Sequence, residues 1–203
     1  MVNNTASFID KSYFKTLSQR DPEEICLKGE CEYDALGKSY KIMAWGDEYV
    51  IYPDEFRITC LNRTKTFFHD YLYLFIIYYL LNFKKAEIQE EWIAEKDIPG
   101  GYAFFRGPHE IPTHFISEFY QNDIQSFKEK CSKLGGTEIK LADAAYRFQI
   151  VPQIWVAVLY WEGDEDFTPE AKVLYDRNII DQLALDIIYA LAVAVCSRIG
   201  RQL

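Results

Sequence analysis

The sequence lacks the residue patterns that mark common metal and cofactor sites. Its five cysteines are scattered, no two are spaced Cys-x-x-Cys, and only three histidines accompany them. A GxxxxGK[ST] phosphate loop, a GxGxxG fingerprint after a strand and a GxSxG nucleophile elbow are all missing. We therefore expect neither a structural zinc site nor an iron–sulfur cluster, and the sequence indicates no particular cofactor.

Positive charge is also scarce. Asp and Glu number 31 against 22 Lys and Arg, which gives a formal net charge of −9. Nucleic acids and anionic membrane surfaces are both bound through clustered basic residues, so neither is an expected partner.

No apolar run is long enough to suggest a membrane span. The two most apolar segments, 67–83 and 179–195, are interrupted by ionisable residues such as Asp70 and Asp186, whereas a span needs about 20 mostly apolar residues. The N-terminal segment MVNNTASFIDK is polar, unlike a secretion signal. With an odd number of cysteines, these features predict a cytoplasmic protein with reduced thiols.

The chain is rich in core-forming side chains. Apolar residues make up 49% and aromatic residues 16% of 203 positions, which is enough for one globular domain over 1–203. Apolar residues alternate in some segments and recur every three or four positions in others. Strands are predicted within 31–60, at 146–150 and at 154–161; helices are predicted at 5–19, at 66–83, at 113–133 with a break near Asn122, from Pro169, and at 179–197.

These elements predict an α+β fold with a mostly antiparallel sheet and helices packed on it. The strand at 154–161 is apolar on both faces, so we expect it at the centre of the sheet. The C-terminal helix should turn one apolar stripe toward the sheet. That stripe comprises Leu183, Ile187, Ala190, Leu191 and Ala194.

Residues 86–112 fit no regular element, apart from a short strand near Trp92. So long an irregular stretch in a compact domain is usually a functional loop or an element missed by the prediction. It is punctuated by the Pro-Gly-Gly turn at 99–101 and carries side chains suited to holding a ligand: Trp92, Phe104, Arg106 and His109.

The segment HEIPTH at 109–114 resembles a zinc-protease signature but does not fulfil it. That signature places two histidines at i and i+4 on one helix. Here His109 and His114 are five positions apart, and Pro112 interrupts a continuous helix. No metal site is predicted from this segment.

The stretch WEGDEDFTPEAKVLYD at 161–176 concentrates four carboxylates within five positions. Thr168 and Pro169 have the chemistry of a helix cap and first residue, and acids before a helix are favoured by its dipole. Asp164 and Asp166 are spaced like ligands of a hard cation, but the further ligands of a calcium loop are missing. A charged loop before a helix, a cation site and an acid–base pair all remain open.

Three strings resemble an uncharacterised domain family of anaerobic bacteria and archaea, catalogued only as a domain of unknown function. They are AWGDEYVI at 44–51, IPGGYAFF at 98–105 and WEGDEDFTPEAKVLYD at 161–176. The last corresponds to a GDEEF-type motif and departs from it at Asp166. Some relatives carry an adjoining cysteine-rich iron–sulfur segment, which this chain lacks. The resemblance implies a fold and an anaerobic, cytosolic setting but no reaction.

The leading hypothesis is a domain that binds a small molecule or cofactor in anaerobic redox metabolism. Its site would combine the loops around 98–108 and 162–167, which we expect to lie close together at one edge of the sheet. The expected ligand-binding residues are Trp92, Phe104, Arg106, His109, Asp164 and Glu165.

Two alternatives belong to other classes of protein. The exposed aromatic residues also suit a protein-interaction module without catalysis, with a protein partner in place of a ligand. A hydrolase or lyase would instead use Asp164 or Glu165 together with a histidine.

Overall fold

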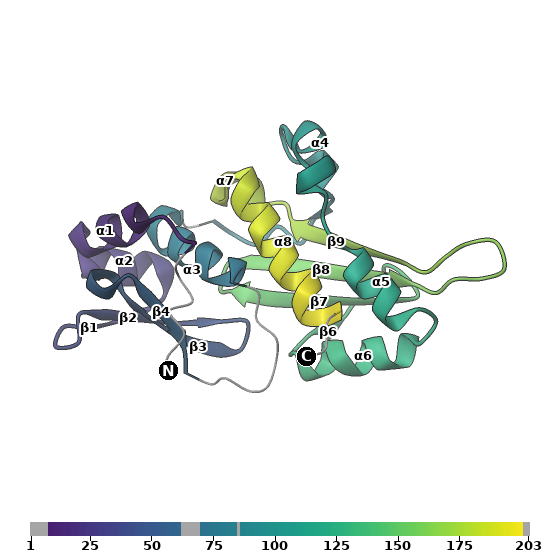
Figure 1. The fold of residues 1–203 in the computed structure, drawn as a ribbon, viewed down its shortest axis with the longest axis horizontal. Coiled ribbons are helices and arrows are strands. Elements are labelled where there is room, and N and C mark those ends of the chain that lie inside the picture. The colour runs from purple at the N-terminus through teal and green to yellow at the C-terminus, as the bar shows by residue number, and fades with distance from the viewer. Residues whose placement is uncertain (1–7, 62–69, 85, 201–203) are drawn as a thin grey trace.

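The computed structural model describes residues 8–61, 70–84 and 86–200, and in these residues it shows an α+β fold with two antiparallel sheets (Figure 1). The first sheet has the order β1-β2-β3-β4 and the second the order β5-β9-β8-β7-β6. The strands are β1 (Glu32–Asp34), β2 (Ser39–Ala44), β3 (Asp47–Tyr52), β4 (Arg57–Cys60), β5 (Trp92–Ile93), β6 (Thr137–Glu138), β7 (Ala144–Val151), β8 (Ile154–Trp161) and β9 (Glu170–Asp176).

Helices cover one face of the second sheet and fill the space between the two sheets. In Figure 1, α8 crosses the five-stranded sheet, and α3 lies between α8 and the N-terminal elements. The α-helices are α1 (Lys11–Gln19), α2 (Pro22–Gly29), α3 (Tyr71–Asn82), α4 (Gly101–Phe104), α5 (His114–Tyr120), α6 (Ile124–Lys133), α7 (Ile179–Gln182) and α8 (Leu185–Gly200); the 3-10 helices are η1 (Pro53–Glu55), η2 (Glu95–Asp97) and η3 (Gly107–His109).

The predicted fold class is confirmed, although the predicted single sheet is divided in two. β8 lies at the centre of the second sheet, as its apolar sequence predicted. Its side chains alternate between two clusters: Val156, Val158 and Tyr160 face the main core under α8, whereas Ala157 and Leu159 face the opposite side. A strand that serves two apolar layers needs apolar residues at every position.

The helix predicted from Pro169 is wrong, because residues 170–176 form β9. They pair with β8 in antiparallel register from Trp161↔Glu170 to Val156↔Tyr175. Ala171, Val173 and Tyr175 are buried and alternate with less buried residues, which is the period of a strand. The Thr-Pro-Glu sequence before them has the composition of a helix start, and this local signal concealed the alternation.

The C-terminal helix is present but interrupted at Leu183–Ala184, which separates α7 from α8. All five positions of the predicted stripe are buried, and Leu191 is fully inaccessible. Every residue from Ala190 to Gly200 is also buried, so the apolar spacing identified buried positions but not a single buried side of the helix. The helix predicted at 66–83 is confirmed as α3 from Tyr71, and its first residues lie outside the described part of the chain.

The tip of the β2–β3 hairpin joins the two sheets. Trp45 and Gly46 both adopt left-handed φ angles of 46° and 78°, the conformation of a type I′ turn. The Trp45 backbone N–H donates a hydrogen bond of 2.7 Å to the carbonyl of Ile150 at the end of β7. Its ring packs edge-on against Phe148 with a centroid distance of 5.4 Å. The first sheet is thus fixed to the second through one turn.

A buried ion pair reinforces this junction. The Arg198 guanidinium near the end of α8 donates to Asp47 at the start of β3 at 2.6 Å, and the two side chains are only 7% and 9% exposed. The guanidinium also lies 4.5 Å from the centroid of the Trp45 ring. Both charges are neutralised by each other rather than by water, so neither partner is replaceable alone.

The irregular segment before β5 is held by side chains of the second sheet and α7. Asp176, which is fully buried, accepts backbone N–H bonds from Gln89 at 3.1 Å and Glu90 at 2.7 Å. Gln182 exchanges two hydrogen bonds with the backbone of Lys84. The segment has few backbone partners of its own, and these buried side chains satisfy it instead.

The ion pair provides a test of the junction. Asp47→Asn should lower the free energy of unfolding by about 3–5 kcal/mol, because it leaves the Arg198 charge buried without its counterion. The double variant Asp47→Leu/Arg198→Met should recover most of that loss, since no buried charge remains. Urea denaturation measures both, and a loss below about 1 kcal/mol in the single variant would show that the pair is solvated.

Candidate functional site

The two loops that were expected to form one site lie apart: Figure 1 shows α4, which belongs to the 98–108 loop, near the start of α8, where Gly100 approaches Leu185, and away from the acidic loop. The acidic loop connects β8 to β9 and forms the tip of a hairpin that stands out from the rest of the molecule (Figure 1). Trp92 pairs with Asp176 at the far end of the same strand. β9 has seven residues, and at about 3.3 Å per residue its ends are roughly 20 Å apart. The expected closeness of the loops is therefore wrong.

The structure brings together two of the six predicted site residues. The Phe104 and His109 rings stack at a centroid distance of 4.6 Å. The Tyr189 ring of α8 packs against the His109 ring in a T-shaped arrangement, with a centroid distance of 5.4 Å and an interplanar angle of 86°. The Tyr189 hydroxyl donates to the carbonyl of Pro108. The aromatic surface that was expected to hold a planar ligand is thus occupied by His109 itself.

The other predicted residues are dispersed. The Arg106 guanidinium lies 3.8 Å from the centroid of the exposed Tyr102 ring. Trp92 packs against the small cluster of Ala145, Ala157 and Leu159 on the face of the second sheet that is turned away from the main core. Ligand binding by any of these residues stays a prediction.

The acidic loop is ordered by one of its own carboxylates. Asp164 accepts backbone N–H bonds from Asp166 at 2.8 Å and Phe167 at 2.9 Å, while its own N–H donates to the Phe167 carbonyl. Gly163 donates to the side chain of Asn122. Asp164 thus serves as a turn-forming side chain, and no hydrogen bond or ion pair joins it to a histidine within the described chain.

The Pro-Gly-Gly turn is explained by close packing of the backbone. A side chain at Gly101 would place its Cβ only 1.9 Å from the carbonyl oxygen of Glu95, and Gly100 has a φ of +79°. Only glycine satisfies both requirements. The turn therefore lets α4 begin in close contact with η2, and this packing explains both glycines without a bound ligand.

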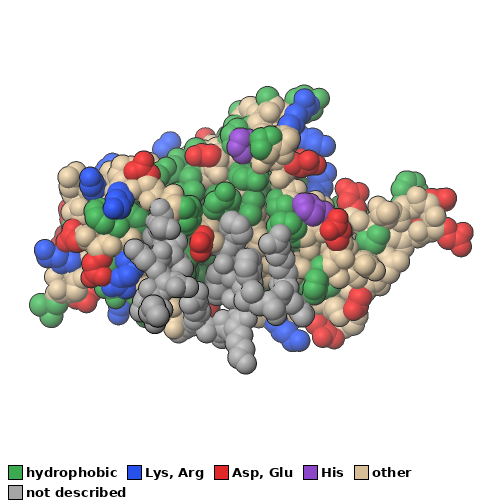
Figure 2. Space-filling model, viewed as in Figure 1, with side chains coloured by type: hydrophobic (Ala, Val, Ile, Leu, Met, Phe, Trp, Pro, Cys, Tyr) green, Lys and Arg blue, Asp and Glu red, His purple; other side chains and the backbone are tan. Residues whose placement is uncertain are grey.

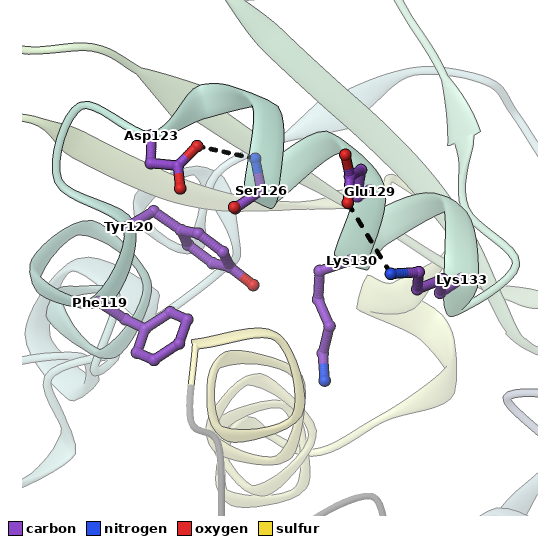
Figure 3. Close-up of a pocket in the computed structure, with 7 residues that line it drawn as sticks. All are labelled: Phe119, Tyr120, Asp123, Ser126, Glu129, Lys130 and Lys133. Carbon is purple, nitrogen blue, oxygen red and sulfur yellow. Dashed lines mark hydrogen bonds and ion pairs between the residues drawn. The ribbon is translucent and has the colours of Figure 1, made fainter.

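A pocket of about 260 Å³ lies between α5 and α6, beside the C-terminal end of α8 (Figure 3). Tyr120 forms part of its wall, and the Tyr120 hydroxyl donates to the carbonyl of Ile199 at 2.7 Å. The half-exposed Phe119 ring lies next to it. The lining residues come from the end of α5 and from one side of α6: Phe119, Tyr120, Asp123, Ser126, Glu129, Lys130 and Lys133.

Both carboxylates of the pocket already have partners. Asp123 caps α6 by accepting the Ser126 backbone N–H at 3.0 Å, and hydrogen bonding from the Ser126 side chain, followed by that from its backbone N–H, lowers the pKa of the Asp123 carboxyl. Glu129 forms an ion pair with Lys133 at 3.8 Å, one helical turn away. Figure 3 shows both interactions as dashed lines along α6.

Of the two lysines that line the pocket, Lys133 pairs with Glu129, whereas Lys130 forms no ion pair within the described residues. Its side chain extends from α6 toward the end of α8 (Figure 3) and is partly buried. Burial is the main cause that lowers the pKa of its ammonium group, and the nearby Arg198 and Lys133 charges lower it further. An anion in the pocket would relieve this unfavourable environment.

Sequence reasoning missed this pocket for an identifiable reason. Asp123, Ser126, Lys130 and Lys133 recur at helical spacing, a pattern that normally marks a solvated helix face. The break at Asn122, which was predicted, allows α5 to return beside α6 and turns that face into a pocket wall. The signal was the polar stripe of α6, but only the tertiary arrangement shows what lies opposite it.

The described residues contain no group of three or more His, Cys, Asp or Glu side chains placed to hold a metal ion. Within the same ranges, no helix is both long and apolar enough to cross a lipid bilayer. The expectation that the protein holds no zinc or iron–sulfur cluster stays a prediction.

The fold and the pocket together define an α+β domain with two antiparallel sheets and a small polar cavity. Residues 21–198 match the family described as Domain of unknown function (DUF3786), and the chain belongs to that family. No curated protein and no solved structure matches the chain significantly.

The role of Asp164 is open to a direct test. Asp164→Ala should lower the free energy of unfolding by about 1 kcal/mol, because two backbone N–H groups lose their acceptor. Glu165→Ala should stay within about 0.5 kcal/mol of the wild type, since its side chain is exposed and makes no contact that orders the loop. Thermal unfolding with and without added calcium compares the variants, and a rise in Tm with calcium that is lost in Asp164→Ala would indicate a cation site instead.

Proposed function

We propose that this domain binds a small anionic molecule in the pocket between α5, α6 and the end of α8. The observation that carries the proposal is Lys130, a partly buried ammonium group whose nearest charged neighbours include the cations Arg198 and Lys133. A protein gains nothing for its stability from such a placement, whereas a bound anion turns it into a favourable interaction.

The size and lining of the pocket indicate the class of ligand. A volume of about 260 Å³ suits a compact metabolite. Lys130 would hold a carboxylate or phosphate group as a point charge. The Phe119 ring and the Tyr120 ring provide an apolar wall, so a carboxylate joined to a planar or apolar body fits better than a bare ion.

The test compares Lys130→Met with Lys128→Met, a matched control on the same helix whose side chain is not part of the pocket. Benzoate and inorganic phosphate, at matched ionic strength, should raise the Tm of the wild type and the control. At a ligand concentration of about 100 times Kd, binding should raise the free energy of unfolding by roughly 2.7 kcal/mol. Lys130→Met should show no rise, while without ligand its stability should equal or exceed that of the wild type by up to about 1 kcal/mol.

The binding should also depend on pH. Because the pKa of Lys130 is lowered, its ammonium group loses its proton at a lower pH than an ordinary lysine, and anion affinity should fall as the pH rises through that value. Calorimetric titration over this range measures the change. Equal responses of the wild type and Lys130→Met, or none in either, would remove the proposal.

The acidic hairpin favours a second candidate function, the binding of a protein partner. Phe167 is 73% exposed at the hairpin tip, beside the exposed carboxylates of Glu165 and Asp166. Figure 2 shows this end of the molecule as a projection with acidic and hydrophobic groups. An exposed aromatic ring among acids suits a partner surface with a small apolar pocket surrounded by basic residues.

The hairpin proposal predicts a selective loss. Affinity purification from the protein's own source should recover a partner with the wild type and with Lys130→Met, but not with the Phe167→Ser/Glu165→Lys variant. The hairpin variant should unfold within about 0.5–1 kcal/mol of the wild type, because both side chains are exposed. Mass spectrometry compares the recovered proteins, and identical sets from all three forms would contradict the proposal.

Three broader expectations accompany these proposals. The chain acts as one domain, supported by a core cluster that runs from α1 through both sheets to α8. Its proposed setting is the cytoplasm of an anaerobe, as the family resemblance implies, and its ligand is proposed to belong to redox metabolism. A hydrolase or lyase that pairs Asp164 or Glu165 with a histidine is supported by no contact between these groups among the described residues.

A further inference from the structure

Two cysteines lie in contact at the end of α2. The thiol of Cys31 donates to the sulfur of Cys26, and the two Sγ atoms are 3.2 Å apart. Both side chains are half-buried. A disulfide bond is about 2.05 Å long, so the sulfurs are roughly 1 Å from bonding distance.

The local backbone explains this contact. Glu30 ends α2 in the left-handed conformation with a φ of 50°, and the Cys31 N–H donates to the Cys26 carbonyl at 3.3 Å. This is the six-to-one hydrogen bond of a Schellman motif, which brings the side chains of these two positions together. In most helices an apolar contact fills this place; here it is filled by two thiols.

A small molecule has access to the pair. Cys31 lines a surface pocket of about 230 Å³ beside β2. Three carboxylates and one ammonium group belong to the same pocket, so its charge favours a cationic reagent over an anionic one. They come from Glu30, Glu32, Glu48 and Lys41.

We propose that Cys26 and Cys31 are a thiol–disulfide exchange site, which reacts with small cationic disulfides and closes to an intramolecular disulfide. The Cys31 thiol loses its proton and its sulfur attacks one sulfur of the reagent. A mixed disulfide forms and the first reagent thiolate leaves, taking up that proton. The Cys26 sulfur, deprotonated in turn, attacks Sγ of Cys31 and releases the second reagent thiol. The protein loses two electrons and two protons, and the reagent disulfide gains both.

The site should react slowly at neutral pH. Burial raises the pKa of the Cys26 thiol, and it raises the pKa of the Cys31 thiol further. The thiolate is the attacking species, so the exchange rate should increase with pH. A slow, reversible thiol pair of this kind responds to a sustained change in the ratio of disulfides to thiols around the protein.

Tryptic digestion gives a direct measurement, because cleavage after Lys28 places the two cysteines in separate peptides, 21–28 and 29–38. The reduced full-length protein is incubated with cystamine, with bis(2-hydroxyethyl) disulfide or with glutathione disulfide, then alkylated, digested and examined by mass spectrometry. We expect the two peptides to be recovered joined, two hydrogens lighter than their sum. The rate should be highest for cationic cystamine and lowest for anionic glutathione disulfide, and higher at about pH 9 than at about pH 7.

Single variants test the order of the steps. Cys26→Ser should accumulate a mixed disulfide on Cys31, and Cys31→Ser should react several-fold more slowly and give no joined peptides. Separate alkylation of both peptides at about pH 9 with every reagent would overturn the proposal. So would preferential joining of either peptide to one containing Cys60, which lies on β4 and is a control for non-selective oxidation. Circular dichroism of the oxidised protein verifies that the fold is retained.

Discussion

The buried ion pair between Asp47 and Arg198 is the constraint on which the arrangement of this protein depends. It joins residues 151 positions apart, one at the tip of the β2–β3 hairpin and the other at the end of the last helix. A charge in this position is tolerated only with its partner present. The pair therefore fixes the end of α8 relative to both sheets, and the end of α8 closes one side of the pocket. The Arg198 charge also lowers the pKa of Lys130, so the same interaction shapes the pocket and its electrostatics.

The three strings that resemble the family are explained by the fold rather than by a reaction. In AWGDEYVI, Trp45, Gly46 and Asp47 form the junction between the sheets. In IPGGYAFF, Gly101 allows a backbone approach that any side chain would prevent. In the acidic string, Asp164 orders a turn. Backbone geometry and buried charge restrict which residue types these positions accept. A search for activity among them alone would therefore concentrate on residues that stabilise the fold.

The fold was largely predictable from the sequence because most helices and strands show their apolar pattern within a few consecutive residues. The continuous apolar run of β8 and the apolar spacing of α8 needed no tertiary information. β9 was misread because Thr168 and Pro169 favour a helix locally, whereas pairing with β8 over six positions favours a strand, and the long-range interaction prevailed. The site was less predictable. Residue types suited to a ligand occur in the 98–108 loop, but whether their surfaces are open depends on α8, whose Tyr189 closes the stack around His109.

Uncompensated charge is a better guide to a binding site in this protein than residue type. Asp176 is fully buried but accepts three backbone N–H bonds, from Gln89, Glu90 and Asn178, so its charge is satisfied and its role is to hold a segment in place. Lys130 is less buried, but it has no ion pair within the described residues, and its pKa is lowered by burial and by the charges of Arg198 and Lys133. A buried carboxylate surrounded by hydrogen-bond donors is already stabilised within the fold. A partly buried cation that faces an open pocket is stabilised only when an anion binds beside it. This difference, which no residue pattern records, places the proposed ligand site at α6 and not at the acidic loop.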